Sequence, residues 1–174
     1  MLIATWNVNS VRTRISQIIN WINQVNPDVL CLQETKVIDD DFPIEPFKNL
    51  GYQVTVFGQK SYNGVAIISK IKLENIIKGF NLDCLNKDVI KKFEDQKRLI
   101  SGDINGIKII NVYVPNGSSL NSDKFKYKIN WLDSLASFLD ASEKKGDLIC
   151  LLGDFNIAPS NIDIHDPKKY EGGI

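Results

Sequence analysis

The sequence alternates between short apolar runs and longer stretches with helical periodicity, and this alternation restricts the chain to an α/β fold. The runs "LIATW" at 2–6 and "DVLCLQ" at 28–33 are typical of strands. Between them lies a stripe of apolar residues at helical spacing, which consists of Val11, Ile15, Ile18, Ile22 and Val25. Ser10 is a candidate N-cap, and Pro27 ends the helix. A strand, a helix and a strand in this order predict two parallel neighbours in one sheet.

Two further pairs of strands are indicated by β-branched runs that flank polar turns. The run "YQVTVF" at 52–57 is expected to pair with "GVAIIS" at 64–69. The runs at 98–104 and 107–114 flank Asn105-Gly106, the dipeptide that best fits a tight hairpin turn. The sequence therefore predicts a hairpin over 98–114.

A second helix is predicted before the last strand. Its expected apolar face consists of Phe125, Ile129, Leu132, Leu135, Ala136 and Leu139. Ser122 is a candidate N-cap and Gly146 a candidate end of this helix, and "DLICLL" at 147–152 is expected to be a buried strand. The lysine-rich segment 87–97 is interpreted as a solvated loop.

Composition favours one soluble domain without a strong net charge. The chain has 174 residues, 43% of them hydrophobic, and 21 basic residues balance 21 acidic ones. A phosphate-binding surface would therefore depend on local arrangement or on bound cations. The three cysteines favour a reducing cytoplasm, with Cys31 and Cys150 acting as small apolar groups. No basic leader and no apolar run near the roughly 20 residues of a bilayer span is seen, so we expect a cytoplasmic protein without a membrane partner.

Polar residues follow three of the apolar runs directly. Asn7 follows "LIATW", Glu34 follows "VLCLQ", and Asp154 and Asn156 follow "LICLLG". In sheets of this kind, ligands gather at the strand ends. Asp154 and Asn156, two positions apart, are expected to point to one face if the segment is extended. We predict that the four side chains converge on one cation that prefers oxygen ligands.

Each of these residues also has an ordinary structural explanation. "GDFN" can be a turn in which Asp154 and Asn156 cap their own backbone, Glu34 can begin a surface loop, and Asn7 can cap the helix near Ser10. Tyr113 alone is by default an aromatic strand residue. His165 is the only histidine, and we interpret it as a loop residue.

The motifs together resemble a known family. "ATWNVNSVRTR", "PDVLCLQETK", "YNGVAIISK", "NVYVPNG" and "LLGDFNIAP", in this order, are similar to the exodeoxyribonuclease III (AP endonuclease) family of the endonuclease/exonuclease/phosphatase superfamily. "LQETK" followed by "GDFN" is specific for the superfamily. The lysine after "QET", together with "YNGVA", favours the DNA-repair branch over DNase I, sphingomyelinases or inositol-phosphate phosphatases.

The resemblance implies a role for each matching residue. Glu34, with Asn7 nearby, would bind Mg²⁺, for which Mn²⁺ can substitute. Asp154 would prepare the attacking water, Asn156 would orient the phosphate or that water, and Tyr113 would contact the scissile phosphate. The resemblance also implies contacts with the DNA backbone, made by Arg98 and Lys128.

The resemblance further implies a substrate and a reaction. The substrate would be double-stranded DNA with abasic or 3′-blocked sites. The reaction would be Mg²⁺-dependent incision 5′ to the abasic site, together with 3′-5′ exonuclease and 3′-phosphodiesterase activity in DNA repair. Members of the family are expected to be monomers when complete.

The implied fold is a DNase I-like, four-layer, two-sheet α/β sandwich whose C-terminal part is missing. Family chains continue for roughly half as much again, with a further active-site Asp, a Trp that helps to recognise the lesion, and a closing Asp-His pair. We therefore expect 1–174 to be an incomplete domain, truncated at the C-terminus, with open strand edges, poor solubility and loss of activity.

Two other functions stay open. One is a phosphatase of the same superfamily that acts on a phospholipid or an inositol phosphate. The other is a non-catalytic fragment that binds DNA or a partner.

Overall fold

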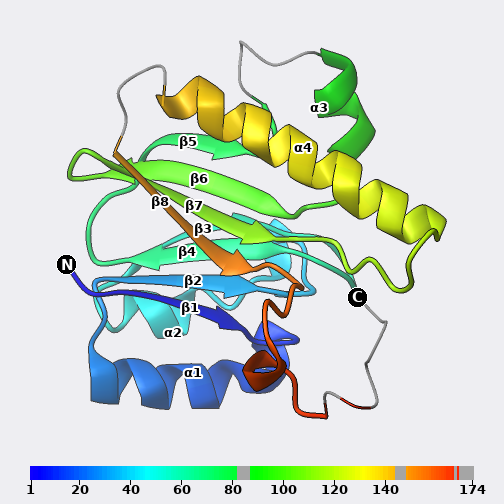
Figure 1. The fold of residues 1–174 in the computed structure, drawn as a ribbon. Helices are drawn as coiled ribbons and strands as arrows, with labels where there is room; N and C mark the ends of the chain where they lie inside the picture. The colour runs from blue at the N-terminus through cyan, green and yellow to red at the C-terminus, as the bar shows by residue number, and fades with distance from the viewer. Residues whose placement is uncertain (82–86, 144–147, 167, 169–174) are drawn as a thin grey trace.

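The computed structural model describes residues 1–81, 87–143, 148–166 and 168. Two four-stranded sheets pack face to face, and helices cover both outer faces (Figure 1). Helices α1 (Val11–Val25) and α2 (Glu45–Lys48) cover the first sheet, while α3 (Lys87–Phe93) and α4 (Asp123–Glu143) cover the second. The predicted four-layer α/β sandwich is confirmed.

The first sheet has the strand order β1-β2-β4-β3. Its strands are β1 (Ile3–Asn7), β2 (Val29–Gln33), β3 (Gln53–Phe57) and β4 (Val65–Ser69). β1 and β2 are parallel across α1, and β4 pairs in antiparallel fashion with both β2 and β3. The predicted strand–helix–strand unit and the predicted pairing of 52–57 with 64–69 are both confirmed.

The second sheet has the strand order β5-β6-β7-β8. Its strands are β5 (Glu74–Lys78), β6 (Leu99–Ile104), β7 (Ile107–Tyr113) and β8 (Leu148–Asp154). Asn105 and Gly106 have φ values of 51° and 78°, the left-handed values that a tight primed turn requires, so the predicted hairpin is confirmed. β8 is parallel to β7, and β5 is a strand that the sequence analysis did not predict.

Each interface between layers has its own apolar cluster. The cluster under α1 and α2 includes Ile18, Ile22 and Phe47, and the cluster under α4 includes Trp131 and Phe138. A third cluster fills the space between the two sheets. Two short 3₁₀ helices, η1 (Asp39–Asp41) and η2 (Asn161–Asp163), lie in connecting segments.

Both predicted N-caps are present. The Ser10 hydroxyl accepts a hydrogen bond from the Thr13 N–H, and the Ser122 hydroxyl accepts one from the Phe125 N–H at 3.1 Å. Gly146, the predicted end of the second helix, lies outside the described residues.

The predicted apolar face of α4 is partly wrong. Ala136 and Ile129 are exposed, and the buried face is centred on Trp131, Leu135 and Phe138. The two aromatic residues decide this rotation, because both rings pack edge-on against Phe80.

The interpretation of 87–97 as a solvated loop is also wrong. Residues Lys87–Phe93 form α3, and Phe93 is buried. Its ring packs edge-on against Phe80 and Tyr127. One aromatic anchor therefore attaches a segment that is otherwise rich in lysine.

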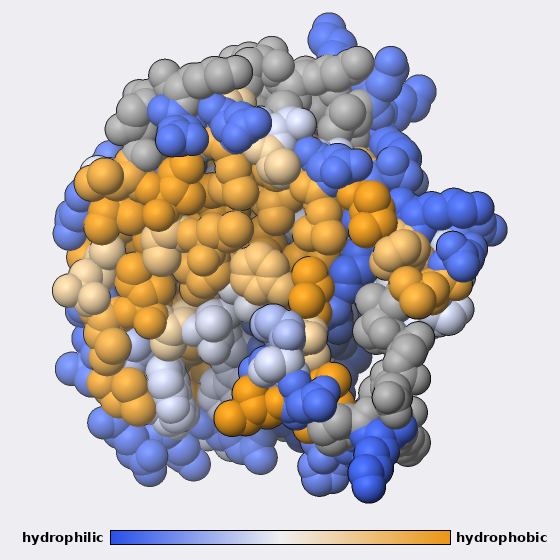
Figure 2. Space-filling model, viewed as in Figure 1, coloured by the Kyte–Doolittle hydropathy of each residue, from blue (hydrophilic) through white to orange (hydrophobic). Residues whose placement is uncertain are grey.

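β1 and β8 are edge strands in the described part of the chain, and they contact each other across the two sheets. Figure 2 shows apolar side chains gathered on the face over β8. Residues of β8 are partly exposed, and the side chain of Leu148 is 69% exposed, whereas β2 is buried throughout. That truncation leaves these strand edges open, and that the chain is poorly soluble, both stay predictions.

Two sequence expectations concern cysteines and membranes. Cys31 is buried, Cys150 is partly buried, and both are free thiols, while Cys84 lies outside the described residues. Burial and the neighbouring Cys150 raise the pKa of the Cys31 thiol well above its ordinary range. None of the described helices has the length and hydropathy of a membrane span.

Candidate metal and catalytic site

The side-chain amide of Asn7 joins two carboxylates that come from different sheets. Its Nδ2 donates to Glu34 Oε1 at 2.8 Å and to Asp154 Oδ2 at 2.7 Å. Its Oδ1 accepts from the Asn9 N–H at 3.0 Å, which fixes the orientation of the carboxamide. Residues 147 positions apart in the sequence are thus brought within hydrogen-bonding distance of each other.

The strand order explains why these residues meet. Asn7 ends β1 and Glu34 directly follows β2, and these two strands are parallel. Tyr113 ends β7 and is the register partner of Asp154 at the end of the parallel strand β8. The carboxyl ends of parallel neighbours lie at the same edge of a sheet. Because the two sheets stack with these edges together, one cluster receives side chains from both.

Glu34 is held by its backbone and by a counter-ion. Its φ is 53°, a left-handed value that few residues other than glycine adopt and that is frequent at functional sites. Lys36 Nζ lies 2.9 Å from Glu34 Oε2 and also donates to Asn9 Oδ1. Burial alone would raise the pKa of Glu34, but hydrogen bonds from Asn7, Lys36 and Tyr113 and the charge of Lys36 outweigh it and lower that pKa.

Asp154 is fixed by a turn rather than by an extended segment. Its Oδ1 accepts from the Asn156 N–H at 2.9 Å, and Asn156 has a φ of 48°. The expectation that Asp154 and Asn156 point to one face of an extended segment is therefore wrong, because the chain turns between them. The carboxamide of Asn156 instead donates to the Val114 carbonyl at 2.9 Å.

Gly153 allows β8 to deliver Asp154 at this point. Its φ is 142°, and a Cβ added there would lie 2.0 Å from the Val112 carbonyl oxygen. Only glycine lets β8 approach β7 this closely.

Tyr113 and Arg98 form a pair on the side of the second sheet. The Arg98 guanidinium lies 4.6 Å from the centroid of the Tyr113 ring, and its Nη1 donates to the Tyr113 carbonyl at 3.2 Å. Burial, followed by the hydrogen bond to Glu34, raises the pKa of Tyr113 to about 12. The phenol thus stays protonated and can donate its hydrogen.

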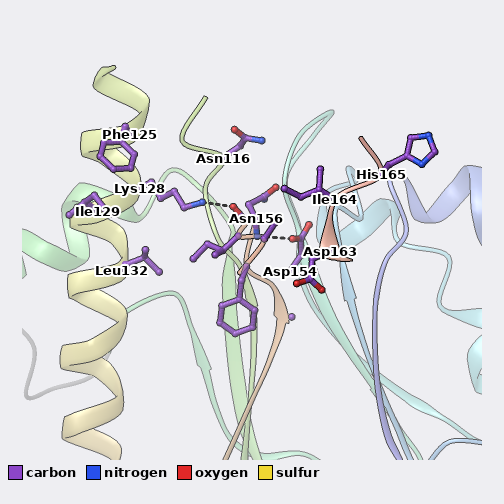
Figure 3. Close-up of a pocket in the computed structure, with 14 residues that line it drawn as sticks. Asn116, Phe125, Lys128, Ile129, Leu132, Asp154, Asn156, Asp163, Ile164 and His165 are labelled. Carbon is purple, nitrogen blue, oxygen red and sulfur yellow. Dashed lines mark hydrogen bonds between the residues drawn. The ribbon is translucent and has the colours of Figure 1, made fainter. Parts of the chain in front are cut away.

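Lys128 is buried, with 2% of the residue exposed. Its Nζ donates to the Asn156 carbonyl at 2.5 Å (Figure 3), and burial lowers its pKa. A DNA-backbone contact by Lys128 stays a prediction. In this structure its ammonium holds the turn that carries Asp154.

A cavity of about 860 Å³ adjoins this turn, between α4 and the segment after β8. It is lined by Phe125, Ile129 and Leu132 of the predicted apolar face of α4. The N-terminal part of that face therefore borders a cavity, whereas Leu135 lies in the core. His165 lines the cavity as an exposed residue of the loop segment after β8, as expected for a loop histidine.

The donor set suits a hard divalent cation. Glu34 and Asp154 supply carboxylate oxygens, and Mg²⁺ needs only one or two carboxylates because it keeps several waters. Within the part of the chain that the structure describes, no group of three or more His, Cys, Asp and Glu residues is arranged to bind a metal. Asn7 turns its amide nitrogen toward the carboxylates. In this orientation it positions the two carboxylates and offers no oxygen to a cation between them.

Sequence reasoning missed three residues around the site. Lys36 was noted only as part of the "QETK" motif, although it pairs directly with Glu34. Gln33 and Asn111 were treated as strand residues, although both are fully buried and hydrogen-bonded to each other. A carboxamide within an apolar strand run, as in "VLCLQ" and "IIN", was the available signal.

Comparison with known proteins gives a consistent result. The sequence model of the Endonuclease/Exonuclease/phosphatase family matches residues 4–173. The chain is 37% identical over 169 residues to "Exodeoxyribonuclease III" of Haemophilus influenzae, which covers 94% of this chain and 60% of that protein.

Solved structures agree in fold. An AP endonuclease from Archaeoglobus fulgidus superimposes with a TM-score of 0.86 at 41% identity, covering 99% of this chain and 64% of that one. The 3′ phosphatase NExo from Neisseria, bound to a product DNA hairpin, gives 0.85 at 38% identity, covering 98% and 63%. The chain thus spans somewhat less than two thirds of the length of these relatives.

Proposed function

Because the chain belongs to the endonuclease/exonuclease/phosphatase family, we propose that its clustered residues form the phosphodiester-hydrolysing centre of a DNA-repair nuclease. The substrate proposed is duplex DNA with an abasic site or a blocked 3′ end. The reaction proposed is incision 5′ to the abasic site, together with removal of nucleotides or blocking groups from 3′ ends.

The observation that carries this proposal is the Asn7 bridge. One carboxamide donates to Glu34 and Asp154, and it thereby places a metal-binding carboxylate beside a candidate base. Neither a turn nor a helix cap requires such an arrangement across two sheets.

The proposed cofactor is Mg²⁺, with Mn²⁺ as a substitute, held by Glu34 from the first sheet beside Asp154 from the second. When bound, such a cation supplies positive charge that stabilises the charge developing on phosphoryl and leaving oxygens. Asn7 keeps the two carboxylates from separating.

The residues of the chain are proposed to perform the proton transfers. Asp154, whose Oδ1 is held by the Asn156 N–H, takes a proton from a water whose oxygen attacks phosphorus. The P–O3′ bond breaks, and the leaving oxygen takes up a proton from the solvent to become a 3′ hydroxyl. The Tyr113 hydroxyl, which bonds to Glu34 in the structure and is protonated at neutral pH, is proposed to turn and donate to a phosphoryl oxygen of the bound substrate.

Arg98 and Lys128 are proposed to act indirectly. Arg98 contacts both the ring and the carbonyl of Tyr113, and Lys128 binds the Asn156 carbonyl. We propose that they hold Tyr113 and the Asp154 turn in position beneath the DNA backbone.

The test is incision of a duplex that carries one tetrahydrofuran abasic analogue, with Mg²⁺ and with EDTA. Asp154→Asn is expected to reduce the rate by at least about 100-fold, since it removes the base. Asp123→Asn is the matched control, because the Asp123 side chain is fully exposed, and it should leave the rate unchanged. Mn²⁺ binding by the parent chain and by Asp154→Asn is measured by calorimetry in parallel.

The alternatives predict different results. Preferential release of phosphate from an inositol polyphosphate would favour the phosphatase. DNA binding that needs no metal and is unaffected by Asp154→Asn would favour a non-catalytic fragment.

A further inference from the structure

We propose that the buried pair Gln33 and Asn111 positions the site, by locking the two sheets in the register that sets Glu34 against Asp154. The pair is assigned a positioning role, since neither residue reaches the substrate side of the cluster. Its consequence for metal binding rests on the function proposed above.

The pair forms a continuous hydrogen-bonded link between the sheets. Gln33 Nε2 donates to Asn111 Oδ1 at 2.7 Å. Asn111 Nδ2 donates in turn to the carbonyls of Leu32 at 3.0 Å and Ala66 at 2.9 Å, which belong to neighbouring strands of the first sheet. A residue of the second sheet is thereby bonded to two strands of the first.

The first sheet also anchors the other end of the link. Gln33 Nε2 donates to Thr5 Oγ1 at 2.9 Å, on β1. The link therefore touches β1, β2 and β4 from a single position on β7. These include both strands that deliver Asn7 and Glu34.

The link lies directly behind the site along the chain. Gln33 immediately precedes Glu34, and Asn111 lies two residues before Tyr113. The register partner of Asn111 on β8 is Leu152, two residues before Asp154. A shift between the sheets at this link would therefore displace Glu34 from Tyr113 and Asp154 by a similar amount.

The surroundings explain why polar groups are needed for this task. The layer between the sheets is otherwise apolar, with Cys31, Ile67, Ile100 and Ile109 among its buried residues. Apolar contacts are not directional and tolerate a small sliding movement. Hydrogen bonds of fixed length and angle do not.

Because the link is buried, it is specific for one register of the two sheets. Gln33 is 1% exposed and Asn111 is 0% exposed. Both amide hydrogens of Asn111 are used and its oxygen accepts, so every polar atom of this side chain has its partner in this register. Any other register would leave buried polar groups unpaired, which is costly.

The experiment compares the parent chain with Gln33→Met, Asn111→Leu and the double variant. Ile109→Val is the matched control, since Ile109 is buried in the same layer on β7. The first readout is the ¹H–¹⁵N signal pair of the Asn7 side-chain amide, which reports directly on both carboxylates and needs no metal. The second is the Mn²⁺ dissociation constant, and the third is the thermal midpoint.

Each single variant should move the Asn7 amide signals toward those of an unbonded carboxamide and weaken Mn²⁺ binding about tenfold, as is usual for residues that orient metal ligands. The double variant should recover part of the thermal midpoint, because no buried carboxamide is left without its partner. It should not recover Mn²⁺ binding, and Ile109→Val should change neither the Asn7 signals nor Mn²⁺ binding.

The inference is overturned if the folded double variant shows parental Asn7 signals, because the pair then only fills space. It is also overturned if Ile109→Val moves these signals as much as Asn111→Leu does. A parent chain that does not bind Mn²⁺ would contradict the proposed function, while the Asn7 signals would still decide the positioning role.

Discussion

The two sheets have the same strand pattern, but the site residues of each sheet are held in place by different kinds of contact. Each sheet has a parallel pair at one edge, β1 with β2 and β7 with β8, followed by antiparallel neighbours. The first sheet provides Asn7 and Glu34 within a short segment of the chain, and Lys36 contacts Glu34 directly. The second sheet provides Tyr113 and Asp154, and their supports Arg98 and Lys128 donate to main-chain carbonyls.

This difference shows where the site depends on local sequence and where on packing. The side chains that hydrogen-bond to Glu34 lie within residues 7–36, apart from Tyr113. In contrast, the turn at Asp154 is held by Lys128 from α4, and Tyr113 is held by Arg98, which directly precedes β6. We therefore expect the second half of the site to be more sensitive to distant changes.

The largest expected effect concerns the helices that cover the two sheets. Trp131→Ala should lower the free energy of unfolding by about 3–5 kcal/mol, and Ile18→Ala by about 2–5 kcal/mol, since both side chains are fully buried. Only Trp131→Ala should also weaken Mn²⁺ binding at a temperature where both variants are folded, because it loosens α4 and thus Lys128. Denaturant melts and calorimetry measure the two quantities.

Equal loss of Mn²⁺ affinity in both helix variants would remove the distinction between the sheets. Leu139→Ala serves as a control on α4, because Leu139 is only partly buried and lies far along the helix from Lys128.

The next largest effect on the free energy of unfolding concerns two glycines with positive φ, Gly153 in the second sheet and Gly51 before a strand of the first. Gly153→Ala should cost about 2–4 kcal/mol, because the new methyl group would collide with the Val112 carbonyl. Gly51→Ala, before β3, meets nothing within 4 Å and should cost only about 1 kcal/mol, from backbone strain alone. Urea denaturation of both variants tests this, and similar values would mean that β8 can move away from β7.

Sequence alone predicted the parts of the fold that depend on local periodicity. The stripe of α1, the N-cap Ser10 and the turn at Asn105-Gly106 are all present. The misassigned parts depend on long-range packing. α3 exists because Phe93 packs against Phe80 and Tyr127, and no local pattern in a lysine-rich segment indicates those partners.

The candidate site shows the same division. The position of Asn7, Glu34 and Asp154 at strand ends was predictable, because apolar runs followed by polar residues mark such ends. The orientation of Asn156 was not, since its left-handed backbone turns the side chain away from Asp154 to Val114. Nor did sequence indicate that Lys128 faces inward, because a lysine on a helix is usually solvated.

Replacing Lys36 or Lys128 by methionine is expected to have a smaller effect, on the affinity for Mn²⁺. Lys36→Met should strengthen Mn²⁺ binding about two- to fivefold, since it removes a cation that competes for Glu34 Oε2. Lys128→Met should weaken it by a similar factor, because the Asn156 carbonyl loses its donor and the Asp154 turn loosens. Calorimetry at fixed ionic strength measures both, with Lys126→Met, an exposed lysine on α4, as the control. Changes of the same sign would show that both lysines act only through their charge.

The smallest expected effect is a difference in alkaline stability between the two sides. Burial, and then the charge of Asp28, raise the pKa of Tyr52, which donates to the Pro27 carbonyl beside the first sheet. Burial also raises the pKa of Tyr127 under the second sheet, but Arg98 opposes the shift.

A raised pKa in the folded state gives stability that is complete below the unfolded value of 10.0 and is lost as the pH rises past it. The free energy of unfolding, measured from pH 8 to pH 11, should therefore fall less steeply in Tyr52→Phe than in the parent. The slope should change less in Tyr127→Phe and not at all in the exposed control Tyr62→Phe. If Tyr127→Phe changes the pH dependence more than Tyr52→Phe does, the charge of Arg98 does not act on Tyr127. Arg98 would then support Tyr113 alone.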